Sequence, residues 1–168
     1  MEKKKLHVIL FTRLALMPAV LGLAFFLPAG TLRFWEAWAY IGIVFFMMAG
    51  VAVVFMKKYT EVLERRMRTK EKETVQKKFV GAGVLLFIAG FLIVGFDRRW
   101  DWCFVPAGLV VFAEAMVILV YALTILVMRE NRFLSRTVEV DAGQTVITTG
   151  PYAIVRHPMY VGVMVLYL

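Results

Sequence analysis

Long apolar runs alternate with short polar segments along this chain. Four of these runs lie at residues 6–27, 35–56, 79–96 and 103–128. About 20 apolar residues in a helix span the hydrocarbon core of a bilayer, so each run predicts a transmembrane helix. A fifth apolar run begins at Pro158 and continues to residue 168. The pattern therefore predicts an all-α membrane protein, a multi-pass helical bundle with four complete transmembrane helices and a truncated fifth, in one integral-membrane domain.

The composition supports a membrane protein and argues against several other classes. Hydrophobic residues make up 61% of the 168 residues, and the mean hydropathy is +0.76, whereas soluble domains are usually about 45–50% apolar. The net charge of +8 follows the polar segments between the runs, so we expect membrane lipids as partners and no nucleic acid. A single cysteine, Cys103, excludes an intrachain disulfide. We expect no metal site.

Positive charge is distributed unequally between the two ends of the predicted helices. Lysine and arginine number three in the N-terminal tail, nine in residues 57–78 and four in residues 129–157. The two short turns at the other end hold Arg33, Arg98 and Arg99. Short loops rich in Lys and Arg face the cytoplasm. The N-terminus and both long polar segments are therefore predicted to be cytoplasmic.

Residues 57–78 form the most charged segment, with four Glu beside the nine basic residues. Within it, Tyr59, Val62, Leu63 and Met67 recur at helical spacing, which predicts an amphipathic helix at the surface over part of the segment. We interpret the segment as a solvated, basic cytoplasmic loop. A sensor for anionic lipid is the alternative, and nothing in the sequence separates the two interpretations.

Residues 129–157 are too polar and too short to span a membrane. They contain a β-branched stretch at residues 145–149, so we expect an extended, non-helical segment packed over the helix ends. A turn is predicted at Gly150 and Pro151, where the two residue types that punctuate helices and strands are adjacent. This segment leads directly into the fifth apolar run.

The densest group of chemically capable residues lies where the fifth run begins. Arg156 and His157 precede Pro158, which suits the first position of a helix because its missing N–H is not needed there. The first N–H groups of such a helix and the positive end of its dipole point back at the loop. We therefore expect a polar ligand that bears a carboxylate to bind at this junction.

Residues 150–162 read G-P-Y-x-x-x-R-H-P-x-Y-x-G. This pattern resembles the signature of the isoprenylcysteine carboxyl methyltransferase family, which belongs to a wider group of membrane methyltransferases that includes phospholipid N-methyltransferases. The resemblance is specific from about Asn131 to Gly162 and general elsewhere. It implies S-adenosyl-L-methionine as the cofactor, and it implies that residues 129–157 are a cytoplasmic cofactor-binding loop.

The resemblance also implies which residues form the site. The cofactor-binding candidates are Gln144, Thr145, Val146, Ile147, Tyr152, His157, Pro158, Met159 and Tyr160. Arg156 and His157 are the candidate catalytic residues, because they could bind the cofactor carboxylate or orient the loop. The rings of Tyr152 and Tyr160 are available to the adenine or to the positively charged sulfur. Asn131 resembles a further family position, although an Asn at a helix end also serves as a cap.

The function that these features favour is methylation of a lipophilic substrate that enters from the bilayer. By resemblance, the preferred reaction is carboxyl O-methylation of a prenylated cysteine. A phospholipid N-methyltransferase, a sterol-type membrane reductase and a non-catalytic membrane fragment are the alternatives. Family members continue through another membrane segment to a region that supplies an acidic residue and an arginine, whereas this sequence stops within the fifth helix. We therefore expect the C-terminal part of the enzyme to be missing.

Three residues inside the predicted helices have open roles. Arg13 and Glu114 lie within spans, where an ionised side chain is costly, and their predicted depths differ by about 10 Å at about 1.5 Å per residue. Glu114 is interpreted as a protonated side chain hydrogen-bonded between helices, with substrate binding as the alternative. Gly162 either leaves room for a lipid chain beside the motif or permits close helix packing.

Overall fold

The computed structural model describes residues 3–67, 74–131, 133–134 and 145–166. Within these residues the protein is all helical, as predicted. The long helices are α1 (Lys3–Ala29), α2 (Trp35–Lys58), α4 (Thr74–Trp100) and α5 (Ala107–Glu130). The short ones are α3 (Thr60–Met67), the 3-10 turn η1 (Gly150–Ala153) and α6 (Pro158–Leu166). The four long helices are apolar and long enough to cross a membrane.

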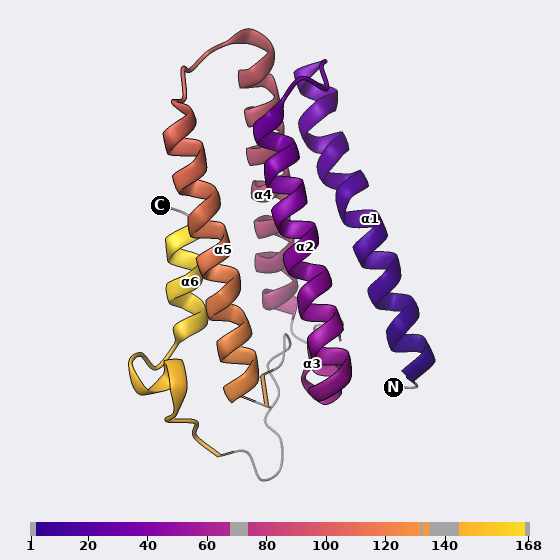
Figure 1. Cartoon of the computed structure of the whole chain (residues 1–168), viewed down its shortest axis with the longest axis vertical. Coiled ribbons are helices and arrows are strands. Elements are labelled where there is room, and N and C mark those ends of the chain that lie inside the picture. Colours follow the sequence, from indigo (N-terminus) through magenta and orange to yellow (C-terminus); the bar gives the residue numbers. More distant parts are fainter. Residues whose placement is uncertain (1–2, 68–73, 132, 135–144, 167–168) are drawn as a thin grey trace.

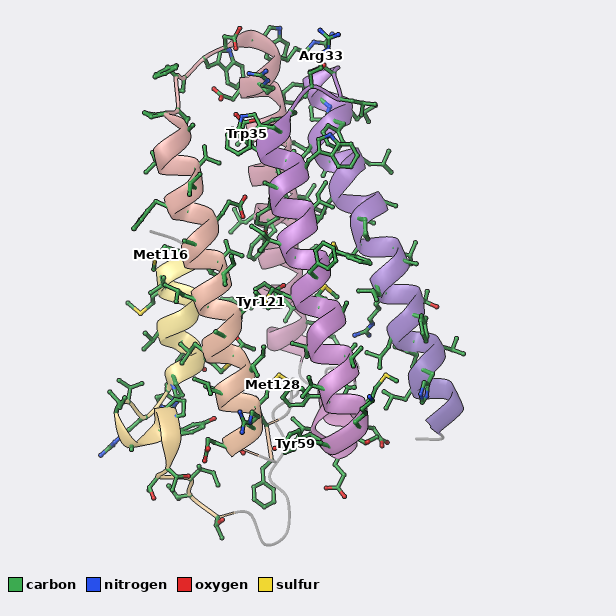
Figure 2. All side chains as sticks on the ribbon, viewed as in Figure 1. Arg33, Trp35, Tyr59, Met116, Tyr121 and Met128 are labelled. Carbon is green, nitrogen blue, oxygen red and sulfur yellow. The ribbon has the colours of Figure 1, made fainter. Side chains whose placement is uncertain are left out.

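The four long helices run side by side, and the short elements gather at one end of the bundle (Figure 1). Helix α1 packs against α2 and α4, α2 packs against α5, and α5 packs against α6. The N-terminus, α3 and η1 all lie at the same end, which we call the motif end. The connections at residues 30–34 and 101–106 lie at the opposite end, which we call the turn end. Figure 2 shows residues at both ends. Tyr59 and Met128 lie near the motif end, and Arg33 and Trp35 lie at the turn end.

Helix boundaries at the turn end differ from the limits of the apolar runs. Helix α4 continues to Trp100, and the chain then reverses through Asp101, whose φ of 48° is in the left-handed region. The carboxylate Oδ1 of Asp97 accepts a hydrogen bond of 2.9 Å from the N–H of Cys103. Helix α5 begins only at Ala107, because Pro106 takes an extended conformation as its N-cap. The apolar residues from Cys103 to Pro106 are therefore a connection between helices.

The two turns at the turn end are linked to each other. The Nη2 group of Arg98 donates a hydrogen bond of 3.2 Å to the carbonyl oxygen of Arg33, and its guanidinium lies 5.9 Å from the ring centroid of Phe34. Below them, α1 and α4 cross at Gly95, where an added Cβ would lie 2.7 Å from the carbonyl oxygen of Phe25. A glycine at this position lets the two backbones approach closely, as small residues do in membrane bundles.

Helix α3 is amphipathic, as the spacing of its apolar residues predicted, but its apolar face packs against the bundle. Val62 and Leu63 are buried in a cluster with Leu6 of α1, Phe55 of α2 and Met128 of α5. Tyr59 separates α2 from α3, since its φ of −137° is outside the helical region. The motif end of the bundle is thus closed by a short helix that packs against α1 and α2 and shares a buried cluster with the end of α5. Residues 68–73 of the basic segment lie outside the described residues, and both interpretations of this segment, a solvated loop and a lipid sensor, stay predictions.

Candidate functional site

The C-terminal end of α5 is the platform for the motif turn. Asn131 follows the last residue of α5, and its backbone N–H donates a hydrogen bond of 3.0 Å to the carbonyl oxygen of Val127. Its side chain bonds in two directions: Oδ1 accepts from the N–H of Phe133 at 3.0 Å, and Nδ2 donates to the hydroxyl of Tyr152 at 3.0 Å. Asn131 therefore caps the helix and also holds one of the predicted cofactor residues, so both interpretations of this residue apply.

The residue before Asn131 makes a second attachment to the turn. The hydroxyl of Thr149 donates a hydrogen bond of 2.8 Å to Oε2 of Glu130. Gly150 has a φ of 57°, and an added Cβ there would lie 2.6 Å from Cγ of Glu130. Only glycine combines this backbone conformation with so close an approach. The turn predicted at Gly150 and Pro151 is formed as a single 3-10 turn, a local helix within the stretch that was expected to be extended.

Helix α6 begins at Pro158, the position that the sequence predicted. The carbonyl oxygen of His157 accepts hydrogen bonds from the N–H groups of Tyr160 at 3.0 Å and Val161 at 3.4 Å. The rings of His157 and Tyr160 stack at a centroid distance of 5.4 Å and an angle of 29°. The Tyr160 N–H is therefore used within the helix, and the predicted anion site must rely on the side chains and on the N–H groups that precede it in the chain.

Two motif residues attach α6 to α5. Pro158 and Gly162 are four positions apart, so they share a face of the helix, and both are buried. A Cβ added at Gly162 would lie 3.2 Å from Cγ1 of Val120 and 3.7 Å from Cδ2 of Leu123. This contact shows that Gly162 permits close packing of α6 on α5. Tyr160 lies on the other face of α6 and is exposed.

The predicted site residues differ in their exposure. Thr145, Val146, Arg156 and His157 are exposed, while Ile147, Tyr152 and Met159 are half-buried. Gln144 lies outside the described residues. The structure brings Asn131 to Tyr152 and His157 to Tyr160. In the part of the chain that is described, no hydrogen bond or ring contact joins these two pairs to each other.

The matched segment coincides with the platform, the turn and α6. Residues 107–168 match the model of the isoprenylcysteine carboxyl methyltransferase (ICMT) family. The match covers 62 of the 168 residues and confirms, for this segment, the resemblance that the motif indicated. The ICMT-family region contains α5, η1 and α6, and every predicted site residue falls within it. No match was found among curated proteins or among solved structures.

Two residues of the ICMT-family region that the sequence analysis missed are Glu130 and Thr149. A signal for Glu130 was present, because a carboxylate at the C-terminal end of a helix faces the negative end of the helix dipole. No comparable signal marks Thr149, which is one of several β-branched residues in its stretch. Its role depends on the turn that brings it back to α5. Among the described residues, no group of three His, Cys, Asp or Glu side chains could hold a metal ion.

A cavity of about 1170 Å³ lies between α2, α4 and α5 and extends to the end of α6 at Val165 and Leu166. Its wall is mainly apolar, with Glu36 and Glu114 among the lining residues. One carboxylate oxygen of each, Oε2, is buried and has no hydrogen-bond partner among the described residues. The interhelical hydrogen bond that was expected for Glu114 is therefore not made by this oxygen. At about 1.5 Å per residue, Glu114 lies about 24 Å along α5 from the platform, so the cavity and the motif turn are distinct regions.

Proposed function

We propose that this protein is an S-adenosylmethionine-dependent methyltransferase that acts on a lipophilic substrate, with carboxyl O-methylation of a prenylated cysteine as its reaction. The observation that carries the proposal is the complete G-P-Y-x-x-x-R-H-P-x-Y-x-G motif, located within a matched ICMT-family region and attached to the end of an apolar bundle. The coarser statement, that the chain is an integral membrane protein with a methyltransferase-family region, rests on the four apolar helices and the family match.

The residues of the motif suit the chemical groups of this cofactor. Arg156 is exposed and positively charged beside the start of α6, where it would hold the cofactor carboxylate. The stacked rings of His157 and Tyr160 form an exposed aromatic surface of the kind that binds an adenine or a sulfonium. On the other side of the turn, Thr145, Val146 and Ile147 would form a second wall. The pocket that we propose is the space between these two walls.

The chemistry requires positioning more than acid–base catalysis. When bound, S-adenosylmethionine supplies a methyl group that its sulfonium already makes electrophilic, and an ionised acceptor carboxylate needs no general base. The tasks left to the protein are to hold the reacting groups in line and to exclude water. Arg156 and His157 are proposed to hold the reacting groups in line. The apolar surface at the start of α6 is proposed to exclude water.

The acceptor is proposed to arrive through the bilayer. Tyr160 and Met164 are 67% and 68% exposed on the face of α6 that points away from α5. In a membrane, this face would contact lipid chains, and transfer of a prenyl chain out of the bilayer costs about 0.8 kcal/mol per CH₂. A substrate anchored beside α6 would present its carboxylate at the start of that helix without leaving the lipid.

The experiment is a cofactor titration of the full chain in nanodiscs, followed by a transfer assay. Labelled S-adenosylmethionine is incubated with a farnesylcysteine derivative or with phosphatidylethanolamine. We expect saturable cofactor binding and a base-labile methyl ester on the prenylated cysteine. His157→Ala should weaken cofactor binding about ten- to hundredfold, which corresponds to about 1.5–3 kcal/mol for a contact to a charged group. His7→Ala, a change of the same kind in α1, is the matched control.

The alternative functions give different results in the same assays. Methylation of the lipid amine with no ester formed would support a phospholipid N-methyltransferase. Saturable binding of a nicotinamide cofactor in place of S-adenosylmethionine would support a sterol-type reductase. Absence of binding to either cofactor in correctly folded protein would leave the non-catalytic membrane fragment as the explanation.

A further inference from the structure

Glu130 occupies a position that its own helix does not favour. It is the last residue of α5, where the helix dipole is negative and a carboxylate is repelled. Local rules of this kind are most often broken where a side chain serves the tertiary structure or the site. The structure gives Glu130 such a use, because its Oε2 accepts a hydrogen bond of 2.8 Å from the hydroxyl of Thr149.

The contact with Thr149 is one of two that hold the motif turn. The adjacent residue, Asn131, donates from Nδ2 to the hydroxyl of Tyr152 at 3.0 Å. Between these two contacts lies Gly150, whose lack of a side chain lets the turn approach Cγ and Cδ of Glu130. The last residue of α5 and the C-cap that follows it therefore hold the turn on both sides of the glycine.

This pair of contacts sets the relation between the two proposed walls of the cofactor site. Residues 145–148 run directly into Thr149, and Tyr152 leads on toward Arg156 and α6. Most of these residues are exposed, so few packing contacts restrain them. The contact at Thr149 holds the turn on the side of the first wall, and the contact of Asn131 with Tyr152 holds it beyond the glycine.

We propose that Glu130 is a positioning residue that fixes the motif turn on α5 and thereby sets the separation of the two walls of the cofactor site. It acts as a hydrogen-bond acceptor for Thr149 and does not touch the cofactor. The link to the cofactor rests on the proposed function, whereas the attachment of the turn does not. The two parts can be tested separately.

The first measurement is amide hydrogen exchange on the full chain in nanodiscs without cofactor. Three variants are compared with the natural sequence: Glu130→Leu removes the acceptor, Thr149→Val removes the donor at nearly constant shape, and Glu130→Gln keeps an oxygen acceptor while removing the charge. We expect exchange at the amides of residues 149–155 to become about tenfold faster in the first two variants. Glu130→Gln should exchange as the natural sequence does, and the amides of α1 should not change in any variant.

The second measurement is the affinity for S-adenosylmethionine. Glu130→Leu and Thr149→Val should each weaken binding about tenfold, with the thermal midpoint of the bundle unchanged. The double variant should be no weaker than either single one, because both remove the same contact. Glu130→Gln should bind normally. The matched control is Glu61→Leu, which removes an exposed carboxylate from α3.

The outcomes separate the possibilities. Unchanged exchange in Glu130→Leu would overturn the proposal whatever the affinity. A loss of affinity in Glu130→Gln equal to that in Glu130→Leu would also overturn it, because the charge would then contact the cofactor directly. If the natural chain binds no S-adenosylmethionine, the proposed function fails, and the exchange data alone decide whether Glu130 holds the turn.

Discussion

At the residue scale, the residues of the motif differ in whether they are buried against α5 or exposed. Pro158 and Gly162 face α5 and are buried, while the intervening Tyr160 faces away and stacks on His157. Gly150 combines a positive φ with the closest approach to Glu130. The named residues of the motif thus belong to two groups. One group attaches the loop to α5, and the other remains accessible to a ligand.

Gly150→Ala should detach the motif turn. The new Cβ would need a φ near 57° and would lie 2.6 Å from Cγ of Glu130, so both backbone strain and steric overlap oppose the native turn. Backbone strain of this kind costs about 1–3 kcal/mol. We expect faster amide exchange at residues 149–155 by mass spectrometry. Gly42→Ala is the control, because no atom lies within 4 Å of its added Cβ, and it should not change exchange in the turn.

Glu114→Gln should leave the bundle as stable as before or make it more stable. The Oε2 atom of Glu114 is buried without a hydrogen-bond partner among the described residues, and an ionised carboxylate within a membrane helix is unfavourable. Glutamine keeps the volume and removes the charge. The measurement is the thermal midpoint in one detergent. A clear fall in this midpoint would mean that the carboxylate has a stabilising partner.

At the element scale, the two short helices α6 and α3 are both stabilised by packing against the long helices. Helix α6 packs on α5, and α3 packs through the apolar face of its amphipathic sequence. Helix α6 has nine residues, and helices shorter than about 12 residues are marginally stable in isolation. Its persistence in this fold depends on the face that it buries against α5. Helix α3 is similarly short, and its buried pair, Val62 and Leu63, attaches it to the ends of α1, α2 and α5.

Gly162→Leu should separate α6 from α5. A Cβ alone would lie 3.2 Å from Cγ1 of Val120, and three further carbon atoms cannot be accommodated without moving the helix. Overpacking of this kind costs about 1–3 kcal/mol. We expect a lower thermal midpoint, with short-chain and long-chain acceptors affected alike. Met164→Leu, a change on the exposed face of α6, should not alter the midpoint. A selective loss of long-chain substrates with unchanged stability would instead assign Gly162 to a lipid path.

At the scale of the whole molecule, the bundle separates two chemically different ends. The motif end holds α3, the N-terminus and the platform with its turn, and the turn end holds the linked connections (Figure 1). Several residues that line the cavity, among them Trp35 and Cys103, belong to the turn end. Most of the lysine and arginine residues belong to segments that begin or end at the motif end. By the positive-inside rule, we propose that the motif end faces the cytoplasm, where a soluble cofactor is available.

This orientation can be tested by labelling one cysteine at each end. Cys103 is exposed at the turn end and provides a native control. In intact cells, an impermeant maleimide should label Cys103 in the natural chain. A Thr148→Cys variant that also carries Cys103→Ser should react only after the cytoplasmic side is opened. Labelling of residue 148 in intact cells would reverse the orientation and contradict the proposed access of the cofactor.

The sequence by itself predicted the long helices, the resemblance of residues 131–162 to the ICMT family and the start of α6. Apolar runs of sufficient length can satisfy their backbone groups in a membrane only as helices or closed barrels, and the length of these runs favoured helices. The Arg-His-Pro junction identified the first turn of α6, because proline is restricted to few helix positions. These features are local, so they can be read from neighbouring residues.

Only the tertiary structure decided which residues hold the site together. The sequence left open whether Gly162 makes room for lipid or for a helix, and the answer depends on Val120, which is more than 40 residues away in the chain. Glu130 and Thr149 were missed because their contact exists only after the loop folds back onto α5. Likewise, Glu36 and Glu114 face one cavity because α2 and α5 are neighbours. Periodicity reports which side chains share a helix face, but it does not report what that face meets.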